Sequence, residues 1–357
     1  MNIAIVLNTF NNSKHVERVL RQFKLIQNSK KNLFYFTIVD DCSHDHTFQG
    51  IERFILNTNL IVQHLILNSK NIGISESRNI AIKLNLDKDY ITFIDGDDYL
   101  DLDEFLNINF DNFNSDLICS SFIHQNLTLK TSYENIFYKS NKTFTKKDVI
   151  NYFSEYMERP NKSSLFTTCW SKFYKLNFLD KNNIFFNAKL KLCEDTEFVF
   201  KVLSKTSKIK YLPKSFYIHT ISNGIENLSK LTFGTKLDLR HQLSFFKPSR
   251  VAWSYLHGNK VYENNLLMKK FNHLITSYLI IYSIRSFVRP LNFFTFFRIY
   301  FFWKFVFKKR IFQKAVQDYS YIQAHGNRFL HFLLKNNMVF LFMFYSSHIS
   351  NKRYLQK

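Results

Sequence analysis

Three carboxylates are grouped around a glycine at the end of a short apolar segment. The segment is residues 90–94, and Asp95, Gly96, Asp97 and Asp98 follow it. This pattern predicts a buried strand whose end brings like charges to one point, where they repel each other unless a cation joins them. Hard oxygen ligands suit Mg²⁺, Mn²⁺ or Ca²⁺, and magnesium sites commonly complete their coordination with water and substrate phosphates. The segment therefore predicts a divalent-metal site for a phosphorylated substrate.

A solvated turn is the alternative interpretation of the same segment. Asp-Gly pairs are common in turns, and Asp98 and Asp101 could instead cap a helix that begins near Asp103. Because short motifs often mislead, this segment alone does not decide between a metal site and a turn.

The first 110 residues alternate segments of strand and helix character. The apolar runs that predict strands are 3–7, 34–39, 60–67 and 90–94, and helical periodicity marks 13–26 and 75–84. This rhythm favours an α/β fold with a mostly parallel sheet flanked by helices, in which ligands bind beyond the carboxyl ends of the strands. Polar clusters lie at three of these ends, in 8–12, 40–47 and 95–98. We therefore expect them to converge on one crevice.

An ordered set of segments resembles the nucleotide-binding half of family 2 glycosyltransferases. The segments are 8–12, 38–45, 71–79, 93–98, 169–174 and 194–198. The resemblance covers roughly residues 1 to 225 and is specific for the family, but it says little about the sugar. It implies a GT-A fold, a nucleotide-sugar donor that is commonly a UDP-sugar, a divalent metal, and inversion at the anomeric carbon.

The resemblance implies roles for four residues on the donor side. Thr9, Asp40 and Asp41 would hold the nucleoside, with a carboxylate accepting from the base or the ribose. Arg78 would face the nucleotide or its phosphates, where its fixed fork of donors suits anionic oxygens. The alternatives are a turn or helix cap for the two aspartates and a surface salt bridge for Arg78.

The resemblance also implies how a metal is held. Asp95 and Asp97 form the D-x-D element, with Asp97 the better candidate for direct ligation of Mn²⁺ or Mg²⁺ and Asp98 in support. His219 is a further candidate ligand. His219 and Ser222 lie where relatives often carry a segment that closes over the diphosphate.

The transfer reaction also needs a base, because an acceptor hydroxyl is a poor nucleophile until a carboxylate takes its proton. By resemblance this base is Asp195, with Glu194 shaping the local field or the acceptor position. Both could instead cap the helix that enters Phe198, since acidic residues favour a helix amino end. Trp170 and Lys172 would line the acceptor side, and a buried core tryptophan is the alternative for Trp170.

Composition bounds the class of protein. The 357 residues are 46% hydrophobic and carry a formal net charge of +21, which predicts a globular chain that attracts polyanions. The four cysteines are far apart, so neither a zinc site nor a disulfide framework is indicated, and a reducing interior fits best. The amino terminus looks like a first core strand rather than a signal peptide, and no apolar stretch is long enough to span a membrane. We expect a cytoplasmic protein.

The carboxyl-terminal third departs from the family pattern. We divide the chain into a catalytic domain, 1–230, and a helical, basic and aromatic region, 231–357. No acidic residue occurs from 264 to 317, and 293–311 mixes Phe, Trp and Ile with basic residues. That mixture suits a helix in the interface of a membrane, so we expect peripheral contact with the inner face of the plasma membrane. A buried helix and an oligomer contact are the rival interpretations.

The sequence thus predicts an inverting, metal-dependent glycosyltransferase that adds a sugar to a growing bacterial surface glycan or a lipid-linked acceptor. The rival from another class is a nucleic-acid-binding protein, which the positive charge and the 18% of aromatic residues would also suit. A nucleotidyltransferase with a similar metal crevice is the second rival. We expect no nucleic-acid partner.

Overall fold

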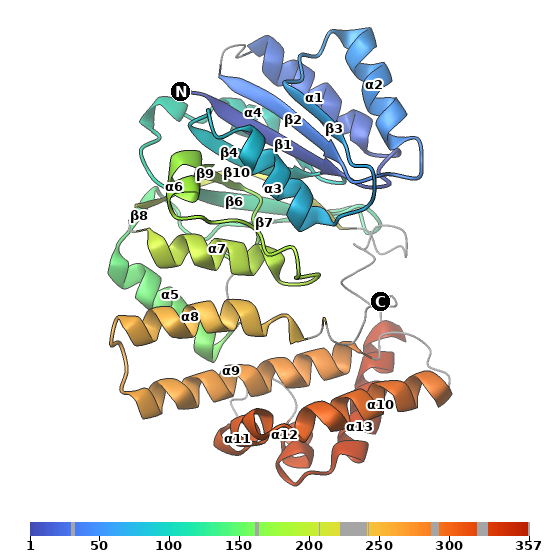
Figure 1. Ribbon diagram of the computed structural model, residues 1–357, viewed down its shortest axis with the longest axis vertical. Coiled ribbons are helices and arrows are strands. Elements are labelled where there is room, and N and C mark those ends of the chain that lie inside the picture. Colours follow the sequence, from blue (N-terminus) through green and yellow to red (C-terminus); the bar gives the residue numbers. More distant parts are fainter. Residues whose placement is uncertain are drawn as a thin grey trace. The chain divides into compact units, whose positions relative to one another are not determined.

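The computed structural model describes residues 1–29, 33–160, 164–206, 208–221, 241, 243–286, 293–319 and 328–355 (Figure 1). The chain forms two compact units. The first comprises Met1–Lys147, Ser164–Leu190 and Glu194–Asn227, and the second Asp148–Ser163, Lys191–Cys193 and Leu228–Lys357. The division expected after residue 230 falls within 222–240, which lies outside the described residues.

Four parallel strands form one half of the sheet of the first unit. They are β1 (Ile3–Thr9), β2 (Phe34–Asp40), β3 (His64–Leu67) and β4 (Tyr90–Asp95), in the spatial order β3-β2-β1-β4. The helices between them are α1 (Val16–Ser29), α2 (Thr47–Thr58) and α3 (Ile74–Leu84). The register places Asn8 opposite Asp95 and Thr9 opposite Asp40, so the three polar loops follow neighbouring strands at one edge of the sheet.

The other half of the sheet is mixed rather than parallel. Its strands are β5 (Tyr99–Leu100), β6 (Leu117–Asn126), β7 (Thr131–Asn135), β8 (Lys142–Phe144), β9 (Lys172–Lys175) and β10 (Ile209–Ile221). Strand β9 runs antiparallel to both β4 and β6, whereas β6 and β10 are parallel. The short helices here are α4 (Leu102–Leu106), η1 (Phe110–Asn112) and α6 (Leu176–Lys181), and α7 spans Glu194–Lys205. The mostly parallel sheet expected from the sequence thus describes only the β3-β2-β1-β4 half.

Apolar periodicity explains how the helices of the first unit pack. Helix α1 buries Val16, Val19, Leu20, Phe23 and Ile26, which are spaced so that they share one face. The ring of Phe23 stacks on Phe36 of β2 at 4.4 Å between centroids. Strand β1 is buried along its whole length, as expected of a central strand covered on both faces. This core holds the strand ends in fixed positions.

The secondary-structure elements described in the second unit are all helices. It contains most of α5 (Lys146–Glu158), together with α8 (Phe246–Gly258), α9 (Asn264–Arg285), α10 (Phe293–Phe307), α11 (Arg310–Asp318), α12 (Arg328–Lys335) and α13 (Val339–Leu355). Its core gathers around the fully buried Trp303, whose indole N–H donates to Ser286 Oγ at 3.1 Å. None of the helices in the described ranges combines the length and apolar character needed to cross a bilayer.

Candidate active site

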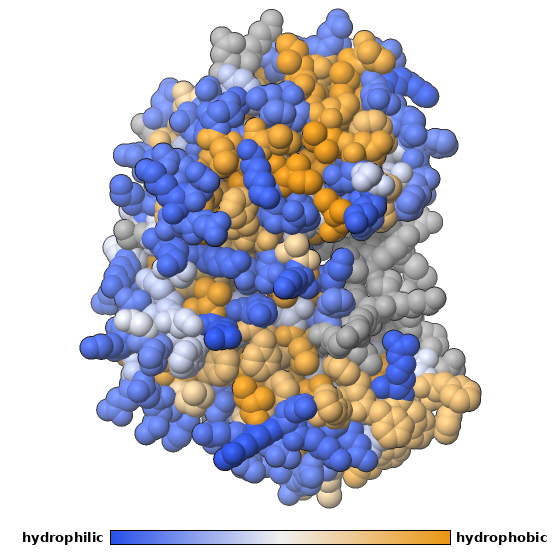
Figure 2. Space-filling view, viewed as in Figure 1, coloured by the Kyte–Doolittle hydropathy of each residue, from blue (hydrophilic) through white to orange (hydrophobic). Residues whose placement is uncertain are grey.

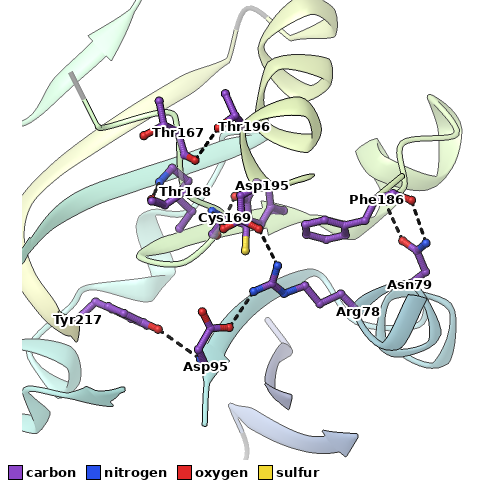
Figure 3. Close-up of polar contacts among 12 residues, drawn as sticks. Arg78, Asn79, Asp95, Thr167, Thr168, Cys169, Phe186, Asp195, Thr196 and Tyr217 are labelled. Carbon is purple, nitrogen blue, oxygen red and sulfur yellow. Dashed lines mark hydrogen bonds and ion pairs between the residues drawn. The ribbon is translucent and has the colours of Figure 1, made fainter. Parts of the chain in front are cut away.

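One buried arginine joins two of the predicted acidic residues (Figure 3). Arg78 Nη2 donates to Asp95 Oδ1 at 2.7 Å, and Arg78 Nη1 donates to Asp195 Oδ1 at 2.6 Å. The arginine is only 1% exposed, so its interpretation as part of a surface salt bridge is wrong. The two carboxylates, 100 positions apart in the sequence, therefore share one guanidinium in the structure.

Helix α3 and two aromatic rings position this arginine. The guanidinium carbon of Arg78 lies 5.2 Å from the ring centroid of Phe186 and 5.9 Å from that of Phe93, and Figure 3 shows the Phe186 ring beside the arginine side chain. Asn79 fixes the Phe186 segment, because its amide donates to Phe186 O at 3.0 Å and accepts from Phe186 N at 2.8 Å. Flat apolar faces suit a guanidinium, which is more weakly hydrated than an ammonium.

The loop after β2 determines where α3 begins. Asp41 accepts hydrogen bonds from Gly73 N at 2.8 Å, Ile72 N at 2.9 Å and Asn68 Nδ2 at 2.9 Å. Gly73 precedes α3 with φ of 90°, a left-handed conformation that favours glycine. Asp41 thus holds the turn that starts α3, and through α3 it contributes to the position of Arg78.

Asp40 and Thr9 form a second fixed loop beside it. Asp40 Oδ2 accepts from Thr9 Oγ1 at 2.8 Å and from Ser43 Oγ at 2.6 Å, while its Oδ1 accepts from Ser43 N at 2.8 Å. Asp40 is fully buried, and Thr9 and Asp41 are nearly so. Asp40 and Asp41 thus make the loop contacts that the turn interpretation predicts. Their predicted role in holding a nucleoside stays a prediction.

The first turn of α7 carries Asp195. Its Oδ2 accepts from Cys169 N at 3.1 Å, and the neighbouring Thr196 Oγ1 donates to Thr167 O at 2.9 Å. The amino end of a helix also favours negative charge. Asp195 therefore lies at the amino end of α7 and also contacts Arg78, so both interpretations apply to it. Arg78 and Cys169 both donate to Asp195, and together they fix the orientation of its side chain.

Glu194 precedes Asp195 in the first turn of α7 and is partly buried. Burial, reinforced by the charge of Asp195, raises the pKa of Glu194 to about 7. One of two adjacent carboxyls is thus tied to an arginine, and the other can hold a proton near neutral pH. An acid whose pKa lies near neutral pH is suited to proton transfer.

The D-x-D loop is held tightly against the end of β1. A Cβ on Gly96 would lie 2.3 Å from Asn12 Nδ2 and 3.2 Å from Asn8 O, so any larger residue would have to displace the Asn12 side chain and crowd the backbone of β1. The backbone oxygen of Asp97 accepts from Arg18 Nη2 and Thr220 Oγ1, each at 2.7 Å. Both contacts are made by the backbone of Asp97 and not by its carboxylate.

Charge accumulates on this loop. Burial, together with the charge of Asp95, raises the pKa of Asp97 to about 6. Burial and the same two carboxylates hold the pKa of Asp98 well above its usual range, although Asp98 accepts from Tyr217 Oη at 2.6 Å and from Thr220 N at 2.8 Å. Asp98 thus joins the loop to β10 and does not cap α4, whose cap is Asp101, an acceptor from Glu104 N.

His219 and Trp170 form an aromatic layer beside the acidic loop. The indole of Trp170 stacks on Tyr217 at 4.7 Å and on His219 at 5.2 Å, and it is 5% exposed. His219 Nδ1 lies 2.8 Å from Nδ1 of His124, so one ring nitrogen donates and the other accepts. Burial lowers the pKa of both histidines, that of His124 to about 4, which favours a neutral pair. Ser222 lies outside the described residues.

Lys172 points into the protein. Its ammonium donates to Trp170 O at 3.2 Å and to Thr168 Oγ1 at 3.3 Å, the residue is 1% exposed, and burial lowers its pKa to about 8. These contacts stabilise the segment that presents Cys169 N to Asp195. The predicted acceptor-side role of Trp170 and Lys172 stays a prediction.

Sequence reasoning did not identify the partners that fix the acidic groups. Cys169 contributes a backbone N–H, Phe186 a ring face, and His124 a ring nitrogen to His219. Only the register of β6 with β10 places His124 opposite His219. Within the described ranges no three His, Cys, Asp or Glu side chains converge as a complete metal-ligand set.

The α/β fold and the acidic site at the strand ends define the class of protein. The family model for glycosyl transferase family 2 matches residues 4–183, which is half of the chain. The chain therefore belongs to glycosyltransferase family 2, and the family resemblance found in the sequence is confirmed.

Particular relatives can also be named. The chain is 25% identical over 231 residues to poly(ribitol-phosphate) beta-N-acetylglucosaminyltransferase TarS of Staphylococcus aureus strain MW2, covering 64% of this chain and 37% of that protein. It is 24% identical over 244 residues to cholesterol galactosyltransferase of Borreliella burgdorferi, covering 65% and 66%. The chain thus spans little more than a third of the length of TarS.

Solved structures confirm the fold. The crystal structure of S. aureus TarS 1-349 in complex with UDP-GlcNAc superposes with a TM-score of 0.61 at 20% identity, covering 100% of this chain and 92% of that one. The predicted GT-A fold with a helical carboxyl-terminal region is therefore confirmed.

Proposed function

We propose that this protein is an inverting glycosyltransferase that moves a sugar from a nucleotide-sugar donor to an acceptor hydroxyl. The observation that carries the proposal is the Arg78 bridge, which brings Asp95 of the D-x-D element and Asp195 to the same guanidinium. Sugar transfer needs a group that helps to bind the donor and a base for the acceptor within one site. We assign the first role to Asp95 and the second to Asp195.

Asp195 is the proposed base. An acceptor hydroxyl attacks the anomeric carbon as Asp195 takes its proton, and the bond from that carbon to the diphosphate breaks on the opposite face, which inverts its configuration. Arg78 and the Cys169 N–H keep Asp195 oriented before the acceptor arrives. Glu194 precedes Asp195 in the chain, and burial raises its pKa to about 7, so we assign to it the role of accepting the proton that Asp195 releases.

The acidic loop has the chemistry expected of a site for Mn²⁺ or Mg²⁺. The raised pKa of Asp97 reflects negative charge that burial and Asp95 leave uncompensated, and a divalent cation would relieve it. One or two carboxylates with water and substrate phosphates are a common set for Mg²⁺. Asp97 would hold the ion, with Asp95 nearby and His219 as a further candidate. When bound, the metal neutralises charge on the departing diphosphate.

A UDP-sugar is the proposed donor, and a growing bacterial surface glycan or a lipid-linked molecule the proposed acceptor. The donor is supported by the crystallised relative that carries UDP-GlcNAc. The names of the two curated relatives point to poly(ribitol-phosphate) and to cholesterol as their acceptors, so the fold is used with polymeric and lipid acceptors alike. Such acceptors would place the enzyme at the inner face of the plasma membrane. The long stretch without acidic residues supports this location.

A thermal-shift panel of nucleoside diphosphates and nucleotide sugars with Mn²⁺ tests the proposal. A ligand that binds only the folded state at 100 times its Kd adds about 2.7 kcal/mol of stability, so UDP or a UDP-sugar should raise Tm by several degrees. The metal-dependent part of the shift should disappear in Asp97→Asn and persist in Asp111→Asn, which alters an exposed aspartate. Pyrophosphate release from nucleoside triphosphates, or salt-sensitive binding of RNA without any nucleotide response, would contradict it.

A further inference from the structure

Helix α10 exposes a stripe of phenylalanines. Phe294, Phe301 and Phe305 are 82%, 59% and 60% exposed, and with Arg298 they lie at the helical spacing i, i+4, i+7 and i+11. The opposite face of the same helix, with Ile299 and Trp303, is buried in the core of the second unit. Large aromatic side chains on the outer face of an already packed helix are costly to leave in water.

The apolar surface continues from α10 onto α13. The ring of Tyr300 contacts both Phe301, at 5.2 Å between centroids, and Phe340 of α13, at 5.5 Å. On α13, Phe340, Leu341 and Phe344 are exposed. We call the exposed apolar residues of these two helices, Phe293, Phe294, Phe301, Phe305, Phe340, Leu341 and Phe344, the aromatic face. Figure 2 shows apolar colouring gathered over α10, at the lower right.

Helix α12 extends the aromatic face. Phe329 contacts Tyr345 of α13 at 5.0 Å and stacks on Phe332, and both phenylalanines are about half exposed. Three helices that share one core thus each expose aromatic side chains. Isolated exposed apolar residues are ordinary, but a contiguous surface of this kind marks an interaction site.

Basic side chains adjoin the aromatic face. Lys309 Nζ lies 4.2 Å from the ring centroid of Phe305, and Lys304 Nζ lies 5.4 Å from that of Tyr300. From residue 264 to 357 the sequence has fifteen Lys and Arg and one acidic residue, Asp318, which accepts from Asn272. An apolar surface bordered by cations with almost no anions is complementary to an anionic lipid surface, where rings enter the acyl boundary and lysines reach the headgroups.

We infer that the aromatic face is a membrane-binding surface for anionic phospholipid. The positive charge favours anionic lipid over a second copy of the chain. A second copy would bring its own positive region against this one, which costs energy. An ordinary protein partner would not require every flanking charge to be basic. Each Lys or Arg near an anionic bilayer adds to the binding, and the rings add apolar burial. The inference deepens the membrane location given under the proposed function by naming the surface that makes the contact.

Vesicle co-sedimentation of the full chain tests the inference, without nucleotide sugar so that the result does not depend on activity. Vesicles of phosphatidylcholine alone are compared with vesicles that also contain phosphatidylglycerol. The triple variant Phe294→Asn/Phe301→Asn/Phe305→Asn removes the stripe. Its matched control is Leu56→Asn/Ile61→Asn/Leu129→Asn, which alters equally exposed apolar residues of the first unit.

A charge variant separates the two contributions. Lys308→Gln/Lys309→Gln/Arg310→Gln removes three exposed cations near the aromatic face, and Lys130→Gln/Lys139→Gln/Lys189→Gln removes three from the first unit. Far-ultraviolet circular dichroism and thermal unfolding verify that each variant folds. Analytical ultracentrifugation of each variant reports self-association.

The inference predicts binding to phosphatidylglycerol vesicles at least about tenfold stronger than to phosphatidylcholine alone. The stripe variant and the charge variant should each bind about tenfold more weakly, and the two controls should bind like the wild type. Equal binding of stripe variant and wild type would overturn the inference. So would a wild-type oligomer that the stripe variant dissociates while vesicle binding stays unchanged, since the face would then join copies of the chain.

Discussion

Replacing Arg78 by methionine tests whether the buried guanidinium holds the site together. Methionine keeps the length and the apolar contacts with Phe93 and Phe186 but leaves two carboxylates without their cation. Removing one partner of a buried ion pair costs about 3–5 kcal/mol. The side chains of Asp95 and Asp195 are 25% and 19% exposed, so water offsets part of the cost. We expect a loss of about 3 kcal/mol in the free energy of unfolding at pH 8, at the lower end of that range.

Urea unfolding measures this loss, and its pH dependence identifies the cause. The cost comes from uncompensated negative charge, so it should shrink when the carboxyls are protonated in acid. The variant should therefore lose more of its stability than the wild type as the pH rises from 4 to 8. Arg21→Met is the control, because Arg21 pairs with Glu17 on an exposed helix face, and such pairs contribute about 0.5 kcal/mol or less.

Two results would refute this reasoning. One is a loss in Arg78→Met no larger than in Arg21→Met, which would mean that the bridge contributes nothing to folding. The other is a large loss that is the same at pH 4 and pH 8, which would trace the effect to packing rather than to charge. A double-mutant cycle with Asp195→Asn then measures the coupling between the arginine and that carboxylate directly.

Three further predictions concern the acidic residues. Asp195→Asn should lower the rate of sugar transfer by about 100-fold or more, because a general base contributes about 10²–10⁴, while calorimetry shows unchanged donor binding; a rate within twofold of wild type would exclude Asp195 as the base. Mn²⁺ affinity should fall as the pH drops below about 6, since protons compete at Asp97, whose pKa burial raises to about 6; an affinity that ignores pH in this window would contradict metal binding there. Without metal, the wild type should lose stability as the pH rises from about 4.5 to 7, because burial raises the pKa of Glu194 to about 7 and the folded state binds protons that the unfolded chain releases. Glu194→Gln should lose less over the same interval, and identical pH profiles would disprove this role.

The convergence of the polar loops could be predicted from the sequence. Apolar runs identified β1, β2 and β4, and parallel strands bring their carboxyl ends to the same edge, so Asn8, Asp40 and Asp95 had to lie near one another. The sequence predicts a helix from Phe198, one turn after the observed start of α7 at Glu194. The turn of helix that this prediction omits carries Glu194 and Asp195.

The bridge itself could not be predicted from local pattern. Arg78 reaches Asp195 only because antiparallel β9 follows β4 in the sheet and sets Cys169 and α7 beside α3, an outcome of tertiary packing that no periodicity reports. The inward orientation of Lys172 was missed for a similar reason. Ser171, just before it, has φ of 58°, which interrupts the alternation expected of an extended strand.

The anomeric configuration of the transferred sugar tests the central claim most directly. The wild-type protein is supplied with an α-linked nucleotide sugar, Mn²⁺ and an acceptor, and the product is observed by nuclear magnetic resonance as it forms. A site in which Asp195 activates the acceptor on the face opposite the diphosphate predicts a β linkage from the first turnover. An α linkage would contradict the account, because it would require attack from the same face as the departing diphosphate.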